Sequence, residues 1–453
     1  FTLIKGGLLH RANGGYLILQ AKDVLNNFQS WEALKRVLKT KEINIEDIKE
    51  QIGLVAVSTL KPEPIPVDIK VILVGSEYIY RLLYAYDEDF RKLFKIKADF
   101  DDEMDRNEEN ITKLARFISA FCEREQTIHF HKTGVAKVVE YASRLVEDQY
   151  KLTTRFNEIA EILCESSAWA QMEGSSLVMA GHVKKAIAEK NYRSDKHHKK
   201  LLELLEEGTI MIDIDGEVIG QINGLSILDL GDYVFGKPSR ITATTYMGES
   251  GIVNIEREIE MSGTSHSKGV LILSGYIGQK YAQEMPLSLS ASLCFEQLYS
   301  GIDGDSASSA ELYAILSSLA EVPIKQSIAV TGSVNQRGEI QPIGGATYKI
   351  EGFFELCKLK GLNGEQGVII PHQNVRNLVL NDEVVEAVKE GKFHIYTVRT
   401  IDEGIKILTG VEAGERRADG TYPEGTINYK VYEKLKRFAR TAVRFGKEEG
   451  KKA

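Results

Sequence analysis

The chain has 453 residues, which predicts about three folded units at roughly 100–200 residues per domain. Hydrophobic residues make up 43% and charged residues 27% of the chain, a globular balance that excludes a disordered protein. The net charge of −8 argues against a dedicated nucleic-acid binder, because neutralising phosphates requires a basic surface.

The cysteines and the apolar runs indicate the cellular location of the protein. The four cysteines lie far apart and form no C-x-x-C pair, so we predict neither a zinc site nor a disulfide framework and expect a cytoplasmic protein. No apolar run reaches the ~18–20 residues that span a bilayer, and the N-terminus has no secretion signal, so we expect no membrane contact. Phe1 in place of an initiator Met suggests a fragment or a processed chain.

Residues 1–100 are typical of an α/β layer. The apolar runs Gly15–Leu19 and Asp68–Gly75 predict buried strands, and Trp31–Leu38 predicts a helix. The proline-rich segment 61–66 between them is expected to be extended. A short strand at Phe94–Phe100 is predicted to close the unit.

The acidic run that begins at Asp101 marks a boundary, and residues 101–195 are predicted to form a four-helix unit. Residues 193–200 are expected to be a polar linker in which His197 and His198 are solvated rather than metal ligands. We therefore predict no metal site in this part of the chain.

Residues 205–410 are predicted to form a mixed α/β or α+β domain, so the whole chain is expected to be an α/β and α+β multidomain protein. The predicted strands include Thr209–Ile214, Ser239–Tyr246 and Gly269–Ser274. Residues 411–453 are predicted to be a tail with a basic amphipathic helix that docks on the domain, with partner or nucleic-acid binding as the alternative.

The stretch Gly301–Glu311 is the most informative for chemistry. Its glycines and aspartates predict a tight turn, and helical periodicity follows, so Ser306 lies where a loop becomes a helix. Free amide groups at a helix N-terminus can stabilise an oxyanion. The structural alternative is a helix cap, since Ser308 and Glu311 have the residue types and spacing of a capping box.

A nucleophilic serine needs a base, and Lys349 is the candidate. It lies in the first turns of a helix that follows Gly344 and Gly345, where the helix dipole and burial would both lower its pKa. Thr331, at a predicted strand end, has a hydroxyl that could orient an amine. The structural alternative for Lys349 is an exposed lysine on an amphipathic helix.

Three blocks, which begin at Gly304, Ala329 and Pro342, resemble the proteolytic domain of the Lon peptidases in order and separation. The first block is similar to the LonB and LonC branches. The resemblance implies a Ser–Lys dyad with Ser306 as nucleophile and Lys349 as general base, and with Asp303 and Thr331 as supporting residues. His266, before the predicted strand at Gly269, is a candidate wall residue of the site, and the alternative is a plain turn histidine.

The resemblance extends upstream to the AAA+ module of Lon. It implies that residues 1–100 are an incomplete and degenerate AAA+ α/β subdomain and that residues 101–195 are its helical lid. The strand at Gly15 should lead into Asp-Glu of a Walker B motif but leads into Gln20 and Ala21, and no G-x-x-x-x-G-K-[ST] P-loop occurs in the 453 residues. Arg155 resembles a sensor-2 arginine.

These features predict a Lon-type serine endopeptidase, most similar to the LonC branch, that needs no cofactor and does not hydrolyse ATP. The resemblance also implies a homohexameric ring that degrades unfolded or loosely folded chains. Two alternatives stay open: an ATP-dependent protease whose P-loop lies upstream of Phe1, and a non-catalytic ring that holds unfolded chains.

Overall fold

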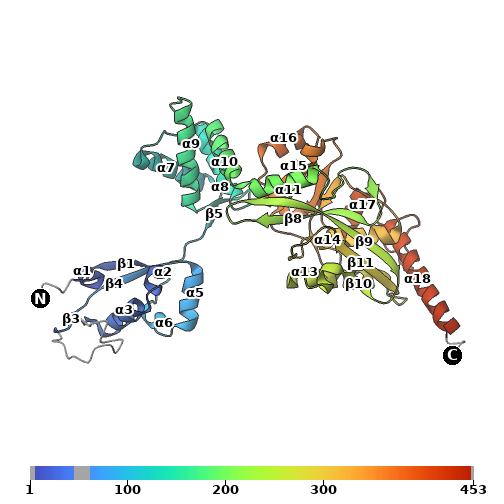
Figure 1. Cartoon of the computed structure of the whole chain (residues 1–453), viewed down its shortest axis with the longest axis horizontal. Coiled ribbons are helices and arrows are strands. Elements are labelled where there is room, and N and C mark those ends of the chain that lie inside the picture. The colour runs from blue at the N-terminus through green and yellow to red at the C-terminus, as the bar shows by residue number, and fades with distance from the viewer. Residues whose placement is uncertain (1–5, 45–61, 450–453) are drawn as a thin grey trace. The chain divides into compact units, whose positions relative to one another are not determined.

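A computed structural model describes residues 6–44 and 62–449 of the chain (Figure 1). The chain divides into two compact units, residues 1–100 and residues 101–453. Each unit has its own hydrophobic core.

The first unit is a small α/β layer around a pair of parallel strands, in which Tyr16 lies opposite Lys70 and Gln20 opposite Val74. The predicted helix at Trp31 is confirmed and begins where the Asn27 side chain accepts a hydrogen bond from the amide of Ser30. The elements of this unit are α1 (Leu8–Arg11), β1 (Tyr16–Gln20), α2 (Ala21–Leu25), α3 (Phe28–Thr40), β2 (Glu42–Ile43), β3 (Ile65–Pro66), β4 (Lys70–Val74), α5 (Glu77–Tyr86) and α6 (Phe90–Leu93).

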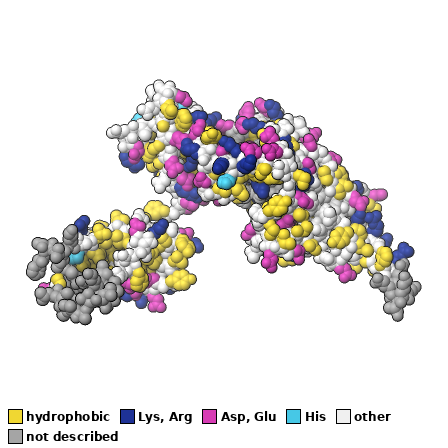
Figure 2. Space-filling view, viewed as in Figure 1, with side chains coloured by type: hydrophobic (Ala, Val, Ile, Leu, Met, Phe, Trp, Pro, Cys, Tyr) yellow, Lys and Arg dark blue, Asp and Glu magenta, His cyan; other side chains and the backbone are white. Residues whose placement is uncertain are grey.

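Three predictions for this unit need correction or restriction. Strands β1 and β4 are not buried on both faces. Tyr16 and Ile18 of β1 are 72% and 66% exposed, and Ile72 and Val74 of β4 are each 44% exposed. Figure 2 shows apolar side chains on the visible surface of this unit. The strand predicted at Phe94–Phe100 is absent from the described residues. Residue 61 of the proline-rich segment lies outside the described residues, and the segment includes the short strand β3.

The second unit begins with four helices, as predicted, around a core that includes Ile118, Val138 and Ile159. Two short antiparallel strands interrupt the expected all-helical pattern and pair Glu103 with Thr153. The elements here are β5 (Glu103–Asp105), α7 (Glu108–Glu125), α8 (Lys132–Arg144), β6 (Lys151–Thr153), α9 (Phe156–Met172) and α10 (Ala180–Ser194).

The predicted polar linker at residues 193–200 is wrong, because α11 (Lys196–Glu206) follows α10 directly. His198 is buried rather than solvated, and its ring stacks on Phe235 with the centroids 4.4 Å apart. Its Nε2 lies 3.0 Å from Glu355 Oε2. The histidine therefore joins α11 to the domain that follows.

A seven-stranded mixed sheet with the order β10-β11-β9-β8-β13-β16-β17 organises the rest of the chain. The longest pairing is antiparallel, between β8 and β9, whereas β8, β13, β16 and β17 run parallel. The elements are β7 (Glu217–Val218), β8 (Gln221–Asp229), β9 (Val234–Met247), β10 (Gly251–Asn254), α12 (Ile255–Glu258), α13 (Thr264–Tyr281), β11 (Leu289–Phe295), α14 (Ser308–Ala320), β12 (Ile324–Lys325), β13 (Ile328–Val330), β14 (Ser333–Val334), β15 (Ile340–Gln341), α15 (Ala346–Lys360), β16 (Gly367–Pro371), η1 (His372–Asn377), α16 (Asp382–Lys389), β17 (His394–Val398), α17 (Ile401–Thr409) and α18 (Ile427–Glu449).

Two of the three predicted strands in this domain are wrong. The strand at Ser239–Tyr246 is confirmed as part of β9. Gly269–Ser274 lies inside the helix α13, and Thr209–Ile214 forms no strand although Ile212 and Ile214 are buried. An apolar run that is buried does not by itself distinguish a helix from a strand.

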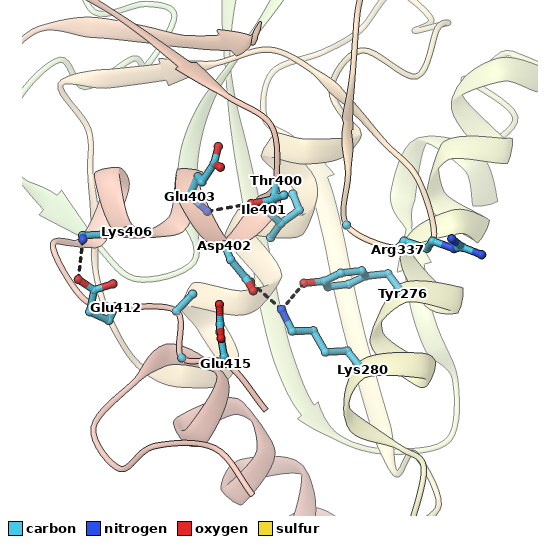
Figure 3. Close-up of a pocket in the computed structure, with 13 residues that line it drawn as sticks. Tyr276, Lys280, Arg337, Thr400, Ile401, Asp402, Glu403, Lys406, Glu412 and Glu415 are labelled. Atoms are coloured by element: carbon cyan, nitrogen blue, oxygen red, sulfur yellow. Dashed lines mark hydrogen bonds and ion pairs between the residues drawn. The ribbon is translucent and has the colours of Figure 1, made fainter. Parts of the chain in front are cut away.

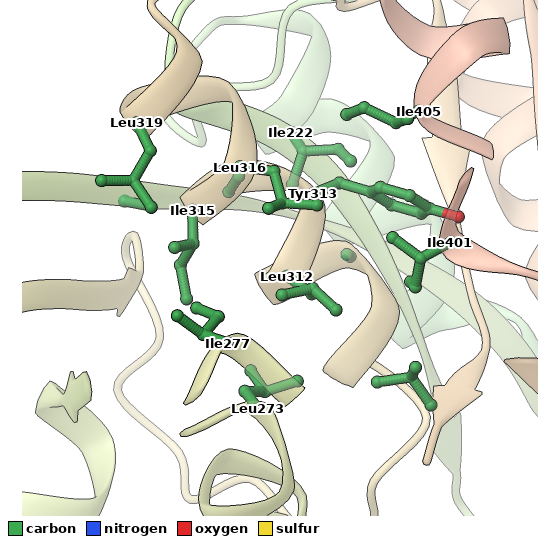
Figure 4. Close-up of a cluster of buried hydrophobic side chains, with 14 of the residues drawn as sticks. Ile222, Leu273, Ile277, Leu312, Tyr313, Ile315, Leu316, Leu319, Ile401 and Ile405 are labelled. Carbon is green, nitrogen blue, oxygen red and sulfur yellow. The ribbon is translucent and has the colours of Figure 1, made fainter. Parts of the chain in front are cut away.

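Helices cover both faces of the sheet (Figure 1). Alternate residues of β13 point to opposite faces, so Ile328 and Val330 belong to one apolar cluster and Ala329 to another. The first cluster includes residues of α13, α14 and α17, and in it the ring of Tyr313 lies between Ile401 and Ile405 (Figure 4). The second contains α15. Helices α14 and α15 therefore pack on opposite faces of the same strands.

The basic helix α18 docks on the first cluster. Val431 and Leu435 on its apolar stripe are fully buried, whereas Val443 and Phe445 near its end are exposed. The predicted docking is therefore confirmed for the first three turns.

Helix α15 approaches strand β9 closely at a pair of glycines. A Cβ atom at Gly352 would collide with the backbone of Gly236, and one at Gly236 would collide with the carbonyl of Tyr348. Backbone is thus packed directly on backbone beside Lys349. This contact holds the helix at a fixed distance from the sheet.

Candidate active site

The loop before α14 carries Ser306 next to a helix N-terminus, as predicted. Ser308 begins the helix and Ala307 is its N-cap, without a side-chain capping bond. The capping-box alternative is wrong, because Glu311 is buried and the hydroxyl of Ser308 accepts a hydrogen bond from the amide of Val334. Among the described residues, the amides of Ser306 and Ala307 donate no hydrogen bond.

Lys349 reaches this loop from the opposite face of the sheet. It is the fourth residue of α15, which begins after Gly345 in the left-handed region at φ +70°. Its Nζ lies 2.9 Å from Ser306 Oγ. The residue is only 2% exposed, so the surface-lysine alternative is wrong.

Thr331 joins the same cluster from the end of β13. Its Oγ1 lies 3.1 Å from Lys349 Nζ and donates a hydrogen bond of 3.3 Å to the carbonyl of Ser306. The amide of Gly332 donates to that carbonyl at 2.8 Å. The strand end thus fixes the serine backbone and the lysine amine together.

The surroundings of Lys349 favour its neutral form. Burial lowers the pKa of Lys349 to about 8, against the opposing effect of the carboxylates of Asp305 and Glu147. About half of the amine is therefore neutral at pH 8. A neutral amine within hydrogen-bond distance of a hydroxyl can accept its proton.

Asp303 is not brought to the serine–lysine pair in the described structure. Its exposed carboxylate accepts hydrogen bonds from the amides of Gly304 and His266, which lower its pKa. The side chain packs against Gly263, where a Cβ atom would overlap it. Asp303 therefore ties the serine loop to the start of α13.

His266 lies within α13 and not in a turn before a strand, so that part of the prediction is wrong. The residue is 1% exposed, its ring contacts the ring of Phe295 edge-on, and its Nε2 lies 3.7 Å from Glu311 Oε1. Burial lowers the pKa of His266. The side chain thus faces Glu311 on α14 rather than Ser306.

Glu311 is a buried acid that the sequence did not single out as one, since its spacing after Ser308 indicated a cap. It is 1% exposed, its Oε1 accepts a hydrogen bond from Asn254, and its Oε2 has no partner among the described residues. Burial, with the nearby charge of Glu256, raises the pKa of Glu311 to about 8. The carboxyl group is therefore protonated in the folded protein at neutral pH.

Replacing Glu311 by Gln is expected to stabilise the fold at high pH and not at low pH. The unfolded chain loses this proton near the ordinary glutamate pKa of 4.5 and the folded chain only near 8, so the free energy of unfolding of the parent falls across this window. The gain for Glu311→Gln should grow to the order of 3 to 5 kcal/mol by pH 8. Urea unfolding at pH 4.5 and pH 8 measures it.

Glu321→Gln, at the end of the same helix, is the control. The ion pair with Lys434 lowers the pKa of Glu321. Loss of this ion pair in Glu321→Gln should therefore destabilise the fold at neutral pH. A gain for Glu311→Gln that is the same at both pH values would contradict a buried neutral carboxyl.

The remaining predicted residues are Gln20 and Ala21, in the first unit, and Arg155, in the second. Gln20 ends β1, and Ala21 begins α2 and is buried against Gly75. Arg155 precedes α9 and forms ion pairs with Asp102 and Glu158. The Asp-Glu pair of a Walker B motif is therefore absent at the end of β1.

Away from the serine–lysine pair, the described residues offer a cavity but no metal site. They contain no group of three or more His, Cys, Asp or Glu side chains that could hold a metal ion. No helix among them is long and apolar enough to cross a membrane. The cavity, of about 520 Å³, lies between α13 and α17, where Lys280 bridges Tyr276 and Asp402 (Figure 3), and it does not include the serine–lysine pair.

Comparison with known protein families matches three separate parts of the chain, in chain order. Residues 1–101 match the LonB-like AAA domain, residues 129–193 the AAA+ ATPase LID domain of archaeal LonB, and residues 300–410 the C-terminal proteolytic domain of Lon protease. The last match contains Ser306, Thr331 and Lys349. The closer similarity to the LonC branch stays a prediction.

Curated relatives match over nearly the whole chain. A putative Lon protease homolog of Escherichia coli K12 is 34% identical over 89% of this chain and 68% of its own length. A putative Lon protease homolog of Haemophilus influenzae is 32% identical over 95% of this chain and 70% of its own length. An archaeal Lon protease of Archaeoglobus fulgidus is 26% identical over 91% of this chain and 63% of its own length.

The fold and the matches define a multidomain protein with an AAA-like domain, an AAA+ lid and a proteolytic domain. The chain belongs to the Lon protease family.

Proposed function

We propose that this chain is a serine endopeptidase in which Ser306 is the nucleophile and Lys349 the general base. The observation that carries the proposal is the distance of 2.9 Å between Lys349 Nζ and Ser306 Oγ at a lysine that is almost fully buried. A nucleophile and a base within hydrogen-bond distance, with the base oriented by a third group, are the signature of covalent catalysis. Thr331 is that third group.

The reaction follows from this geometry. Neutral Lys349 removes the proton of Ser306 Oγ as the oxygen attacks the peptide carbonyl, and the amides of Ser306 and Ala307 stabilise the oxyanion. Protonated Lys349 then gives its proton to the leaving amine as the C–N bond breaks. Water, deprotonated by the same amine, releases the acyl group from Ser306.

The proposed peptidase works without ATP hydrolysis and without a cofactor. ATP hydrolysis in the AAA+ module needs acidic residues after the Walker B strand to hold Mg²⁺ and to activate water, and Gln20 and Ala21 stand there. Neither side chain carries a carboxylate, so neither supplies the negative charge with which acidic residues hold Mg²⁺ or a base that can activate water. Ala21 is moreover buried.

The proposed substrates are unfolded or loosely folded polypeptides, because a chain without ATP-driven unfolding cannot open a stable domain. The proposed assembly is a homohexameric ring in the cytoplasm, as the resemblance to Lon implies. Ring formation would enclose the serine–lysine pairs and so exclude folded proteins.

Incubation of a natively unfolded protein with and without ATP and Mg²⁺ tests this function. We expect cleavage at the same rate under both conditions. A strict requirement for ATP would overturn ATP independence and favour the ATP-dependent protease. No cleavage under either condition, together with binding of the unfolded protein, would favour the non-catalytic ring.

A further inference from the structure

The end of α8 and the connection that follows it, residues 144–150, contact the helix α15, which carries Lys349, and the segment around η1. Arg144, the last residue of α8, forms a two-pronged ion pair with Glu351, with Nη1–Oε1 and Nη2–Oε2 distances of 2.7 and 2.6 Å. Its Nη1 also donates a hydrogen bond of 2.8 Å to the carbonyl of Val379. Its guanidinium lies over the ring of Tyr348, 5.6 Å from the centroid.

Further contacts fix the same connection to the segment around η1. Asn377 donates to the carbonyl of Glu147 at 2.9 Å, and Gln149 donates to the carbonyl of Leu378 at 2.8 Å. Asp148 pairs with Arg376 at 2.7 Å. Several directional bonds within a few residues make this a rigid contact rather than a hinge.

The position of Glu351 makes the contact relevant to the proposed catalysis. Glu351 follows Lys349 by two residues, so the two side chains leave α15 in nearly opposite directions. Lys349 points toward Ser306, whereas Glu351 is held by Arg144 and by the amide of Asn381 at 2.7 Å. The close packing on Gly236 blocks movement toward the sheet. Rotation or sliding of α15 that moved Lys349 away from Ser306 would also displace Glu351 from Arg144, so the ion pair opposes that movement.

We propose that Arg144 is a positioning residue for peptide cleavage, which acts through Glu351 to hold Lys349 at hydrogen-bond distance from Ser306. The proposal rests on the proposed function, because it assumes that Lys349 is the base. It makes the helical part of the chain a structural component of the peptidase site. A displacement near 1 Å at such a site costs about 100-fold in rate.

The test is a double-mutant cycle that measures cleavage of an unfolded protein without ATP. Arg144→Met and Glu351→Met are each expected to lower kcat by about 10- to 100-fold with KM within about twofold, since geometry is lost and binding is not. The double variant should lose no more than either single variant, because both changes remove one pair. Arg193→Met is the matched control: it breaks a two-pronged pair with Glu165 within the helical part, at 2.8 and 2.7 Å, and should leave kcat within about twofold.

Arg144→Met leaves the buried Glu351 carboxylate without its charged partner and with only the amide of Asn381 as a donor, which can prevent folding. The double variant replaces both charges by apolar side chains and avoids this cost, so its kcat decides where the single variant does not fold. A folded double variant with the kcat of the parent would overturn the proposal while the proposed function stands. Single effects that multiply in the double variant would also overturn it. A parent that cleaves nothing would overturn both.

Discussion

Ser306→Ala is expected to reduce cleavage of an unfolded protein to the background rate, a loss of at least ~10⁴-fold in kcat/KM. The substitution removes one oxygen atom, which in the proposed reaction is the atom that forms the acyl bond. Ser306 is only half-buried and its hydroxyl contacts Lys349, so the fold should persist. The measurement is the initial rate of release of new N-termini, with thermal unfolding of both proteins beside it.

Ser308→Ala is the matched control for this variant. Ser308 lies two residues further along, is buried, and accepts a hydrogen bond from the amide of Val334. Its loss should cost about 1 kcal/mol of stability and less than tenfold in rate. Activity of Ser306→Ala at even a few per cent of the parent would rule out Ser306 as the nucleophile.

The activity of the parent is expected to rise with pH through about 8. Only neutral Lys349 can take the serine proton, and burial lowers the pKa of Lys349 to about 8 from the ordinary lysine value of 10.5. Below this pH the neutral fraction falls tenfold per pH unit, so kcat/KM should rise about 100-fold between pH 6 and pH 9. An unburied lysine would put the same rise near pH 10.

The pH profile of kcat/KM on a short unstructured peptide measures this pKa. Asp305→Asn removes a carboxylate that raises the pKa of Lys349, so its profile should move to lower pH. A flat profile between pH 6 and 9 would contradict Lys349 as the base. A rise centred near 6.5 would instead indicate a histidine.

The sequence predicted the parts of the site that depend on local pattern. The turn before α14 follows from the glycines and aspartates around Ser306, and the start of α15 follows from Gly345. The distance between Ser306 and Lys349 could not be predicted from their surroundings alone, because it depends on two helices on opposite faces of a sheet. The resemblance to Lon supplied that pairing.

The wrong predictions share a physical cause, which is burial that sequence does not reveal. The run at Gly269 contains β-branched and apolar residues, yet it forms α13, whose buried residues face several neighbours and give little periodicity. His198 stands among basic residues but is buried against Phe235. Glu311 has the spacing of a cap but points into the core. Each outcome depends on residues distant in sequence.

The strands β1 and β4 show the opposite error, because residues predicted to be buried are exposed. Their continuous apolar runs predicted buried strands. Tyr16 and Ile18 are exposed among the described residues. The apolar character of a strand shows that its faces can be buried. Which face is buried can be read only from the structure.

In the proposed reaction Ser306, activated by Lys349, forms the acyl-enzyme without ATP. Acylation of the protein with a peptide p-nitrophenyl ester in ATP-free buffer tests this step: the reaction is quenched with acid, the protein is digested, and the acyl group is located by mass spectrometry. We predict an acyl group on Ser306 in the parent and none there in Lys349→Ala. An acyl group on another residue, with cleavage that persists in Ser306→Ala, would contradict Ser306 as the nucleophile.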